Sequence, residues 1–207
     1  DRPAARTLAE RAVAASPANA SALLALSYTR QADADIAGAQ AAIEQALAAN
    51  PTDALLWSRK AELAAAMNDP NGALEAADRA VGLAPDISRS YTVRGFVALS
   101  ALATEVATAA FDEAIRLDST DPLPQLGRGL AAIRQGMPDE GTRHIKLAVG
   151  LDPSNALLRS YLGKAFFEQY RDPAAAIEYR RSRLLDPSDP TPWVYDAIRL
   201  MANNEPI

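Results

Sequence analysis

Few residues in this chain could carry out catalytic chemistry. His144 is the only histidine and cysteine is absent, which excludes a multi-histidine metal site, a disulfide and a cysteine nucleophile within the chain. The glycines of residues 127–129 imitate part of a dinucleotide-binding fingerprint, but no strand pattern precedes them. Asp33 and Asp35 could supply oxygen ligands to calcium, although helix caps and turns use the same residue type. The sequence therefore predicts a chain that is not an enzyme, with no catalytic residue, no cofactor and no metal.

These residues lie in a sequence that repeats itself. The phrase LDPS begins at Leu151 and again at Leu185, which is 34 residues later. Counting back from Pro153 by the same interval reaches Ser119, Pro85, Pro51 and Pro17. Each interval contains two apolar-periodic segments at helical spacing, separated by short breaks rich in Asn, Asp, Gly and Pro. Because no alternating strand pattern appears, the sequence predicts pairs of helices that stack on one another.

Small side chains recur at fixed positions of the period, counted from three residues after each proline. The eighth position is small throughout: Ser27, Ala61, Gly95, Gly129, Gly163 and Ala197. Small residues let two helix backbones approach closely, and larger ones such as Trp57 and Trp193 fill the space beside them. We therefore interpret the aromatic residues as core residues rather than as a cofactor-binding cluster. We expect His144, in the second helix of its interval, to face solvent.

A 34-residue helix pair with an aromatic residue at position 4, a small residue at 8, alanine at 20 and 27, and proline at 32 resembles the tetratricopeptide repeat. The resemblance covers nearly the whole chain. It implies an all-α fold, a right-handed α-solenoid of stacked 34-residue helix–turn–helix repeats. The family's leucine at position 7 is replaced by Lys60, Arg94 and Arg128. Either those repeats pack more loosely, or their long side chains lay apolar stems on the core and carry the charge out to water.

The phasing predicts one solenoid domain over residues 1–207. A lone second helix occupies 1–19, whole repeats occupy 20–53, 54–87, 88–121, 122–155 and 156–189, and a lone first helix occupies 190–207. A solenoid normally ends in a helix with a polar outer face, which the last segment, PWVYDAIRLMA, does not have. We therefore expect the chain to be a fragment of a longer protein whose repeats continue.

The resemblance also implies a concave groove, lined by first helices, that holds an extended or helical segment of a partner protein. Carried over position by position, the predicted groove residues are Leu24, Tyr28, Leu55, Arg59, Glu62, Arg89, Val93, Phe96, Leu126, Leu130, Tyr161, Lys164 and Phe167. Most of them are apolar, which suits a partner held by apolar anchors and oriented by a few polar contacts. Within the groove, Tyr28 and Phe96 are the predicted anchors. Arg59 and Arg89 are predicted to orient one acidic group of the partner.

Two other kinds of function remain open from the residues alone. The chain could be a self-assembling scaffold whose uncovered terminal helices stack head to tail, or a recruitment module of a larger enzyme or envelope protein. The net charge of −5 argues against nucleic acid as the partner. No stretch is long and apolar enough to insert into a membrane. The alanine-rich and arginine-rich composition suggests a bacterial source, and we expect a soluble protein of the cytoplasm or periplasm.

Overall fold

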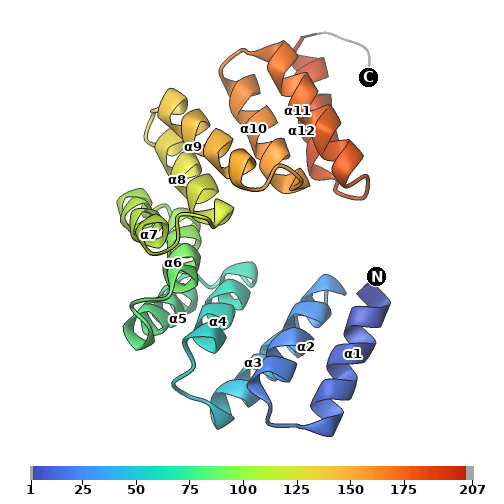
Figure 1. Ribbon diagram of the computed structural model, residues 1–207, viewed down its shortest axis with the longest axis vertical. Helices are drawn as coiled ribbons and strands as arrows, with labels where there is room; N and C mark the ends of the chain where they lie inside the picture. The colour runs from blue at the N-terminus through green and yellow to red at the C-terminus, as the bar shows by residue number, and fades with distance from the viewer. Residues whose placement is uncertain (1, 204–207) are drawn as a thin grey trace. The chain divides into compact units, whose positions relative to one another are not determined.

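The structure is a computed structural model that describes residues 2–203, and over this range it is an all-α helical-repeat solenoid with no strand (Figure 1). Its helices are α1 (Arg2–Ala15), α2 (Ala20–Ala32), α3 (Ile36–Ala49), α4 (Ala54–Ala66), α5 (Pro70–Leu83), α6 (Ser88–Ser100), α7 (Thr104–Leu117), α8 (Pro122–Arg134), α9 (Pro138–Leu151), α10 (Ala156–Glu168), α11 (Asp172–Leu185) and α12 (Thr191–Ala202). None of them is long and apolar enough to cross a bilayer. The part of the predicted last helix segment that falls on residues 204–207 lies outside the described residues.

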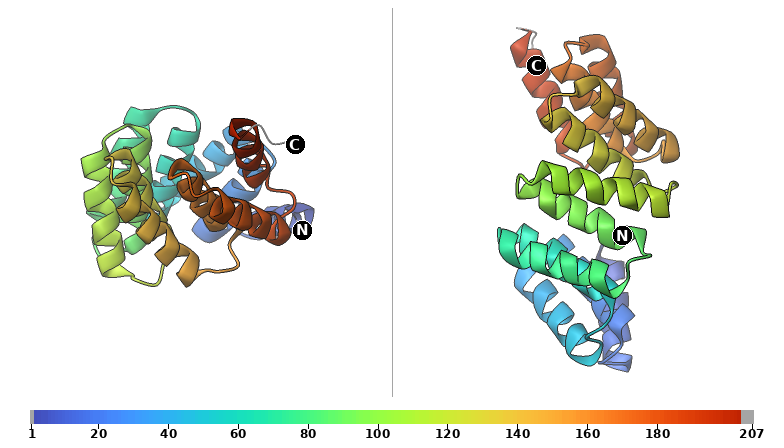
Figure 2. Two further views of the ribbon diagram at one scale, coloured as in Figure 1. Left: turned by 90° about the horizontal axis from the view of Figure 1, so that it is seen from above. Right: turned by 90° about the vertical axis from the view of Figure 1, so that its left-hand side faces the viewer.

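The structure divides the chain into two compact units, where the sequence predicted one domain. The first unit runs from Asp1 to Val106 and the second from Ala107 to Ile207, so the division falls within α7. In a stacked-repeat chain each repeat contacts mainly its neighbours, and a compact unit therefore needs only a few consecutive helices. In both units, consecutive helices pack side by side as antiparallel neighbours (Figure 2).

Four of the five whole repeats begin their first helix at a capping residue, whereas α6 begins at Ile87 without a side-chain cap. The side-chain oxygens of Asn19, Asp53, Asp121 and Asn155 accept hydrogen bonds from backbone N–H groups in the first turns of α2, α4, α8 and α10. These N–H groups have no partner within the helix, so the cap satisfies them and fixes where the helix starts. The sequence pattern therefore sets the helix boundaries locally.

The turn between the two helices of each repeat contains one residue in the left-handed backbone region. These residues are Ala34 (φ 63°), Asn68 (φ 60°), Leu102 (φ 63°), Gly136 (φ 79°) and Tyr170 (φ 58°), spaced by one repeat length. The residue that follows closes the turn by donating back to a helix carbonyl, as Asp35 does to Arg30 at 2.9 Å. Such a closure is the usual way for a helix to satisfy its last carbonyls. Only Asn68 and Gly136 are residue types that adopt this conformation at little cost.

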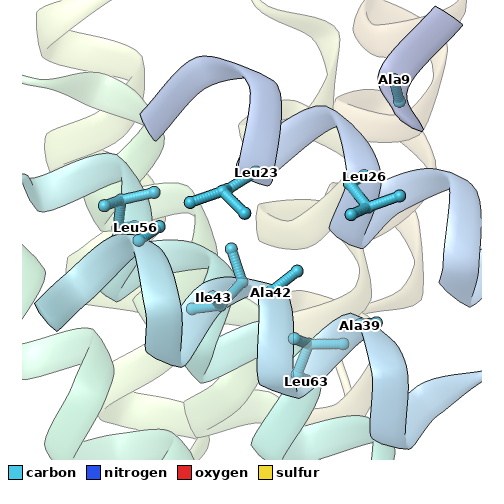
Figure 3. Packing of buried hydrophobic residues seen from close by; sticks show 9 residues of the cluster. Ala9, Leu23, Leu26, Ala39, Ala42, Ile43, Leu56 and Leu63 are labelled. Carbon is cyan, nitrogen blue, oxygen red and sulfur yellow. The ribbon is translucent and has the colours of Figure 1, made fainter. Parts of the chain in front are cut away.

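The core of the first unit consists of small and branched residues from successive helices. Leu23 and Leu26 of α2 point toward Ala42 and Ile43 of α3, with Leu56 of α4 beside them (Figure 3). All five side chains are buried. The alanines of the predicted small positions, Ala39, Ala46, Ala61, Ala73 and Ala80, are all fully buried. They allow close helix contact, as the sequence pattern predicted.

In the second unit two glycines make a close contact between α8 and α9. A Cβ atom placed on Gly129 of α8 would lie 2.7 Å from the carbonyl oxygen of Gly141 in α9, and one placed on Gly141 would lie 2.6 Å from the carbonyl oxygen of Gly129. Only hydrogen atoms fit between these two backbones. On α10, Gly163 in the same way makes room for the buried ring of Tyr179.

The cationic residues at position 7 are partly buried, and Arg94 and Arg128 pair with carboxylates that are more than half exposed. Arg94 donates to Asp78 at 2.6 Å, and Arg128 donates to Asp112 at 3.0 Å. Both pairs join a first helix to the preceding second helix across the same sequence interval, so the ion pair replaces the contact that leucine makes elsewhere. Lys60 instead places its ammonium 4.9 Å from the centroid of the Trp57 ring, which is a cation–π contact.

Candidate functional site

Three successive first helices of the first unit bring four polar side chains together. Tyr28 comes from α2, Arg59 and Glu62 from α4, and Arg89 from α6. The guanidinium carbon of Arg59 lies 3.9 Å from the centroid of the Tyr28 ring, and its Nη1 donates to Glu62 Oε2 at 2.9 Å. Its Nε and Nη2 donate to the hydroxyl and the carbonyl of Ser27, at 2.9 and 3.2 Å. The small residue at position 8 is therefore also the residue that holds this arginine.

The carboxylate of Glu62 is shared between two arginines. Arg89 Nη2 donates to Glu62 Oε1 at 2.7 Å and to the Tyr28 hydroxyl at 2.5 Å, and that hydroxyl donates to Glu62 Oε2 at 3.2 Å. Burial raises the pKa of Tyr28, and the negative charge of Glu62 raises it further, so the hydroxyl stays protonated and can donate. Two guanidinium groups face one carboxylate, which leaves one positive charge in excess. We call these four residues the Tyr28–Arg89 cluster.

The structure places the thirteen predicted groove residues at different depths. Three of them are buried, which corrects the prediction that their side chains line a surface: Arg59 is 2% exposed, Val93 6% and Leu126 2%. Arg59 is buried because Ser27, Tyr28 and Glu62 enclose its guanidinium. The exposed residues are Tyr28, Leu55 and Arg89. Those that are partly buried are Leu24, Glu62, Phe96, Leu130, Tyr161, Lys164 and Phe167.

The second unit has an apolar surface on α10 and α12. Val194, Ile198 and Met201 of α12 are 55%, 46% and 67% exposed. They occupy positions 5, 9 and 12 of the period, which are positions of the predicted groove in the other repeats. Sequence reasoning missed them because it ended the groove at the fifth whole repeat, although the same positions applied to residues 190–203 would have found them. We call Val194, Ile198 and Met201 the α12 strip.

Side chains of α10 continue this surface. Lys164 pairs with Glu168 at 3.1 Å and places its ammonium 5.7 Å from the centroid of the Tyr195 ring. Phe167 lines a pocket of about 360 Å³. The pocket is lined by Phe167, Glu168, Tyr170, Asp172, Ala202 and Asn203. It has room for one side chain of a ligand.

A buried arginine attaches α12 to α11. Arg199, which is 8% exposed, donates to Asp172 at 2.6 Å and to Asp196 at 2.8 Å. Asp196 also accepts from Arg183 of α11. Burial by itself would raise the pKa of Asp196, but the hydrogen bonds from Arg183 and Arg199 hold it below its ordinary value. The carboxylate is therefore charged at neutral pH, and the ion pairs fix the orientation of the α12 strip.

His144 is largely enclosed, contrary to the expectation that it faces solvent. Its side chain is 18% exposed, and Nδ1 lies 2.8 Å from Oε1 of Gln125 on α8. With that oxygen as acceptor, Nδ1 carries the proton. Burial lowers the pKa of His144, and the positive charges of Arg128 and Arg143 lower it further, whereas Glu140 and Asp112 raise it.

This environment predicts a pH-dependent stability. Below about pH 6.5, which is the ordinary pKa of histidine, the unfolded chain takes up a proton that the folded chain binds less well. The contribution of His144 to the free energy of unfolding is therefore fully present above that pH and decreases as the pH is lowered. Urea unfolding between about pH 7.5 and pH 5.5 should show a smaller loss in His144→Gln than in the wild type. The same loss in both proteins would contradict the burial of this side chain.

Among residues 2–203 no group of three or more histidine, aspartate or glutamate side chains is placed to hold a metal ion. Asp33 and Asp35 have other roles. Asp33 accepts a hydrogen bond from Arg6, and Asp35 caps α3 through the N–H of Gly38. The glycines at 127 and 129 lie inside α8, packed against Phe111 and Gly141.

Comparisons with known proteins agree with this architecture. A family model of the tetratricopeptide repeat matches residues 24–86 and 126–190. The structure of TTC0263, a thermophilic TPR protein of Thermus thermophilus, has a TM-score of 0.82 at 22% identity, over 88% of this chain and 100% of that chain. The Cut9–Hcn1 hetero-tetramer of the APC/C also gives 0.82, at 18% identity, over 98% of this chain and 40% of that chain. YrrB, a TPR protein with an unusual peptide-binding site, gives 0.56 at 14% identity, over 91% of this chain and 97% of that chain.

The comparison with curated protein sequences gives no match. At the identities above, the solved structures show a common fold and no more. The family model covers more than half of the 207 residues, in the phase that the helices, caps and small positions define. The chain belongs to the tetratricopeptide repeat family.

Proposed function

We propose that this chain binds a segment of a partner protein on the surface of its first helices. Tetratricopeptide repeats are generally protein–protein interaction modules. The Tyr28–Arg89 cluster is the observation that carries the proposal, because three helices hold an aromatic ring and an exposed guanidinium side by side before any ligand arrives. Such preorganisation lowers the entropy cost of binding.

Within the cluster, Arg89 is the residue that meets an acidic group of the partner. Its side chain is 46% exposed, and among the described residues only Nη2 has hydrogen-bond partners. Nε and Nη1 remain for a ligand, and because they lie on different edges of the guanidinium plane, each donates separately to an acidic group. Arg59 is too buried to take part directly. Its role is to pack against one face of the Tyr28 ring and to form an ion pair with Glu62.

Tyr28 and Phe96 are the proposed apolar anchors on this unit. Tyr28 is 38% exposed, although Arg59 covers one face of its ring. Phe96 is partly buried on α6, the helix that also carries Arg89. Aromatic side chains that are held in place lose little conformational freedom when they bind, which is why they often dominate binding energy.

The second unit offers a surface of different chemistry. The α12 strip presents three exposed apolar side chains, and the pocket beside Phe167 can accept one more from the ligand. Burial of apolar area is the main source of affinity there. We propose that this surface binds apolar side chains of a partner segment.

The experiment measures binding of peptides selected from a random display library against the immobilised chain. Phe96→Ala should weaken binding about thirtyfold, as expected for the loss of an aromatic anchor. Arg89→Ala should weaken the binding of peptides that contain Asp or Glu by about tenfold, because one charge-assisted contact is lost. It should also make the affinity of these peptides depend less on salt concentration. The matched control is Arg79→Ala, which removes an exposed arginine of α5 in the same unit and should change neither property.

Circular dichroism must show unchanged helicity in all three variants for the comparison to hold. Peptides that bind Phe96→Ala and Arg89→Ala as tightly as the wild type would place the binding site elsewhere on the molecule.

A further inference from the structure

Four recurring positions form the outward face of the second helices. Positions 22, 25, 26 and 29 of the period are three, four and seven residues apart, so they lie on one side of a helix. In α9 and α11 all eight residues at these positions are exposed. One is Gly150, and the others are either cationic or large and apolar. We call these seven the α9–α11 face: Arg143, Lys146, Leu147, Ile177, Arg180, Arg181 and Leu184.

The second helices that come earlier in the chain have a different composition at the same positions. In α3, α5 and α7 no apolar residue larger than alanine occurs there, and most of the charged residues are acidic. The charged residues are Glu44, Glu75, Asp78, Arg79, Asp112, Glu113 and Arg116. The repeat pattern by itself therefore does not account for four cations and three large apolar side chains on α9 and α11.

Most of the positive charge on this face has no ion-pair partner within the chain. Among the described residues, Arg143, Lys146 and Arg180 form no ion pair. Arg181 pairs with Glu178 at 2.7 Å, but the same carboxylate also pairs with Arg159 at 2.9 Å. The face therefore has an excess of positive charge, although the chain as a whole has a net charge of −5.

The cationic surface continues from α9 to the start of α11 across α10, which packs against both helices (Figure 1). Lys146 places its ammonium 5.3 Å from the centroid of the Phe166 ring on α10. The guanidinium carbon of Arg171, the exposed residue before α11, lies 4.5 Å from the same centroid. Two cations from different elements thus converge on one ring, with no carboxylate paired to either among the described residues. Such an arrangement attracts an anionic group.

The apolar side chains of the face argue against a membrane or nucleic acid as the partner. Ile177 and Leu184 are 51% and 73% exposed, and Arg180 and Arg181 lie between them on the same side of α11. A helix that binds in a membrane surface gathers its apolar residues on one side and its charges on the other. The phosphate backbone of a nucleic acid would pair with the arginines, but it gives aliphatic side chains no apolar surface to bury against.

An acidic segment of a partner protein meets both requirements of this face. Its carboxylates can pair with Arg180 and Arg181, while apolar residues one turn away on the same side bury Ile177 and Leu184. A second copy of the chain does not offer such a segment on α3, α5 or α7, because the acidic positions there have no large apolar neighbour at the positions of the outward face.

We propose that the α9–α11 face binds an amphipathic segment of a partner protein in which two acidic residues are flanked by apolar ones. The site lies on second helices of the second unit. It is therefore separate from the binding surface of the first helices and does not depend on it.

A synthetic helical peptide tests the proposal by fluorescence anisotropy. The peptide has leucine at positions i and i+7 and glutamate at i+3 and i+4, which complements α11. It should bind the wild type, and a peptide with lysine in place of both glutamates should not. Arg180→Glu should weaken binding at least about tenfold and Leu184→Ala about fivefold. Both side chains are exposed, so the melting temperature should stay the same.

Arg79→Glu is the matched control, because it reverses a charge at position 26 of α5 and should leave the affinity unchanged. Arg89→Ala and Phe96→Ala should also bind the glutamate peptide as tightly as the wild type. Loss of binding in these two variants but not in Arg180→Glu would assign the peptide to the first helices and overturn the proposal. So would a wild type that does not bind the glutamate peptide, or that binds both peptides equally.

Vesicles of phosphatidylserine and phosphatidylcholine serve as a further probe. The wild type should not bind them. Binding to these vesicles that is lost in Arg180→Glu would overturn the proposal, because it would assign the α9–α11 face to a lipid surface.

Discussion

Replacing Gly129 by alanine should lower the free energy of unfolding by about 2 to 3 kcal/mol, although the change adds only one methyl group. The new Cβ atom would lie 2.7 Å from the carbonyl oxygen of Gly141 and 2.7 Å from Cγ1 of Ile145. A side chain can rotate away from such a contact, but the backbone of α9 cannot. The helices α8 and α9 would have to separate, which would loosen the packing around Ile145, a fully buried residue.

Gly150→Ala is the matched control for this prediction. Gly150 lies in α9 of the same unit, and a Cβ atom placed on it meets no other atom within 4 Å. Alanine there should raise the free energy of unfolding by about 0.5 to 1 kcal/mol, because it restricts the unfolded chain and favours the helix. Urea unfolding followed by circular dichroism measures both variants. If the free energy of unfolding changed with the same sign in Gly129→Ala and Gly150→Ala, the contact between the α8 and α9 backbones would be contradicted.

Arg59→Ala should lower the free energy of unfolding by about 3 kcal/mol. Arg59 is the largest of the fully buried side chains among the described residues, and its removal leaves a cavity next to the Tyr28 ring. The Ser27 hydroxyl loses its donor at the same time, and Oε2 of Glu62 keeps only the hydrogen bond from Tyr28. Glu62 keeps Arg89 as an ion-pair partner and some contact with water, which limits the cost.

The control for Arg59→Ala is again Arg79→Ala, which removes an exposed arginine of the same unit. This variant should unfold at the same urea concentration as the wild type within error. Equal stability of Arg59→Ala and Arg79→Ala would mean that Arg59 does not occupy the enclosed position between Ser27 and Glu62.

The features that the sequence alone determined are those that depend on spacing along the chain. The interval of 34 residues predicted the helix pairs, and the structure and the family match confirm an all-α repeat fold. The small residues at position 8 predicted close helix contact, which the structure shows at Gly129 and Gly163. A helix and its caps involve residues a few positions apart, so the local pattern contains the information that decides them.

The tertiary structure decided what each charged and polar side chain does. The sequence placed Arg59 and Arg89 near each other, but not Glu62 between them, and it left Arg94 and Arg128 with two possible roles. It also placed His144 in solvent. The hydrogen bond from Arg89 to Tyr28 joins residues that are 61 positions apart.

Side chains that point to the same face can come from any of three successive helices, and spacing along one helix does not say which of them will meet. A long guanidinium group reaches whichever acceptor the neighbouring helix offers, because an unpaired buried charge is costly. Whether such a residue is exposed to a partner or satisfied within the fold is therefore settled only by the packing of one repeat against the next.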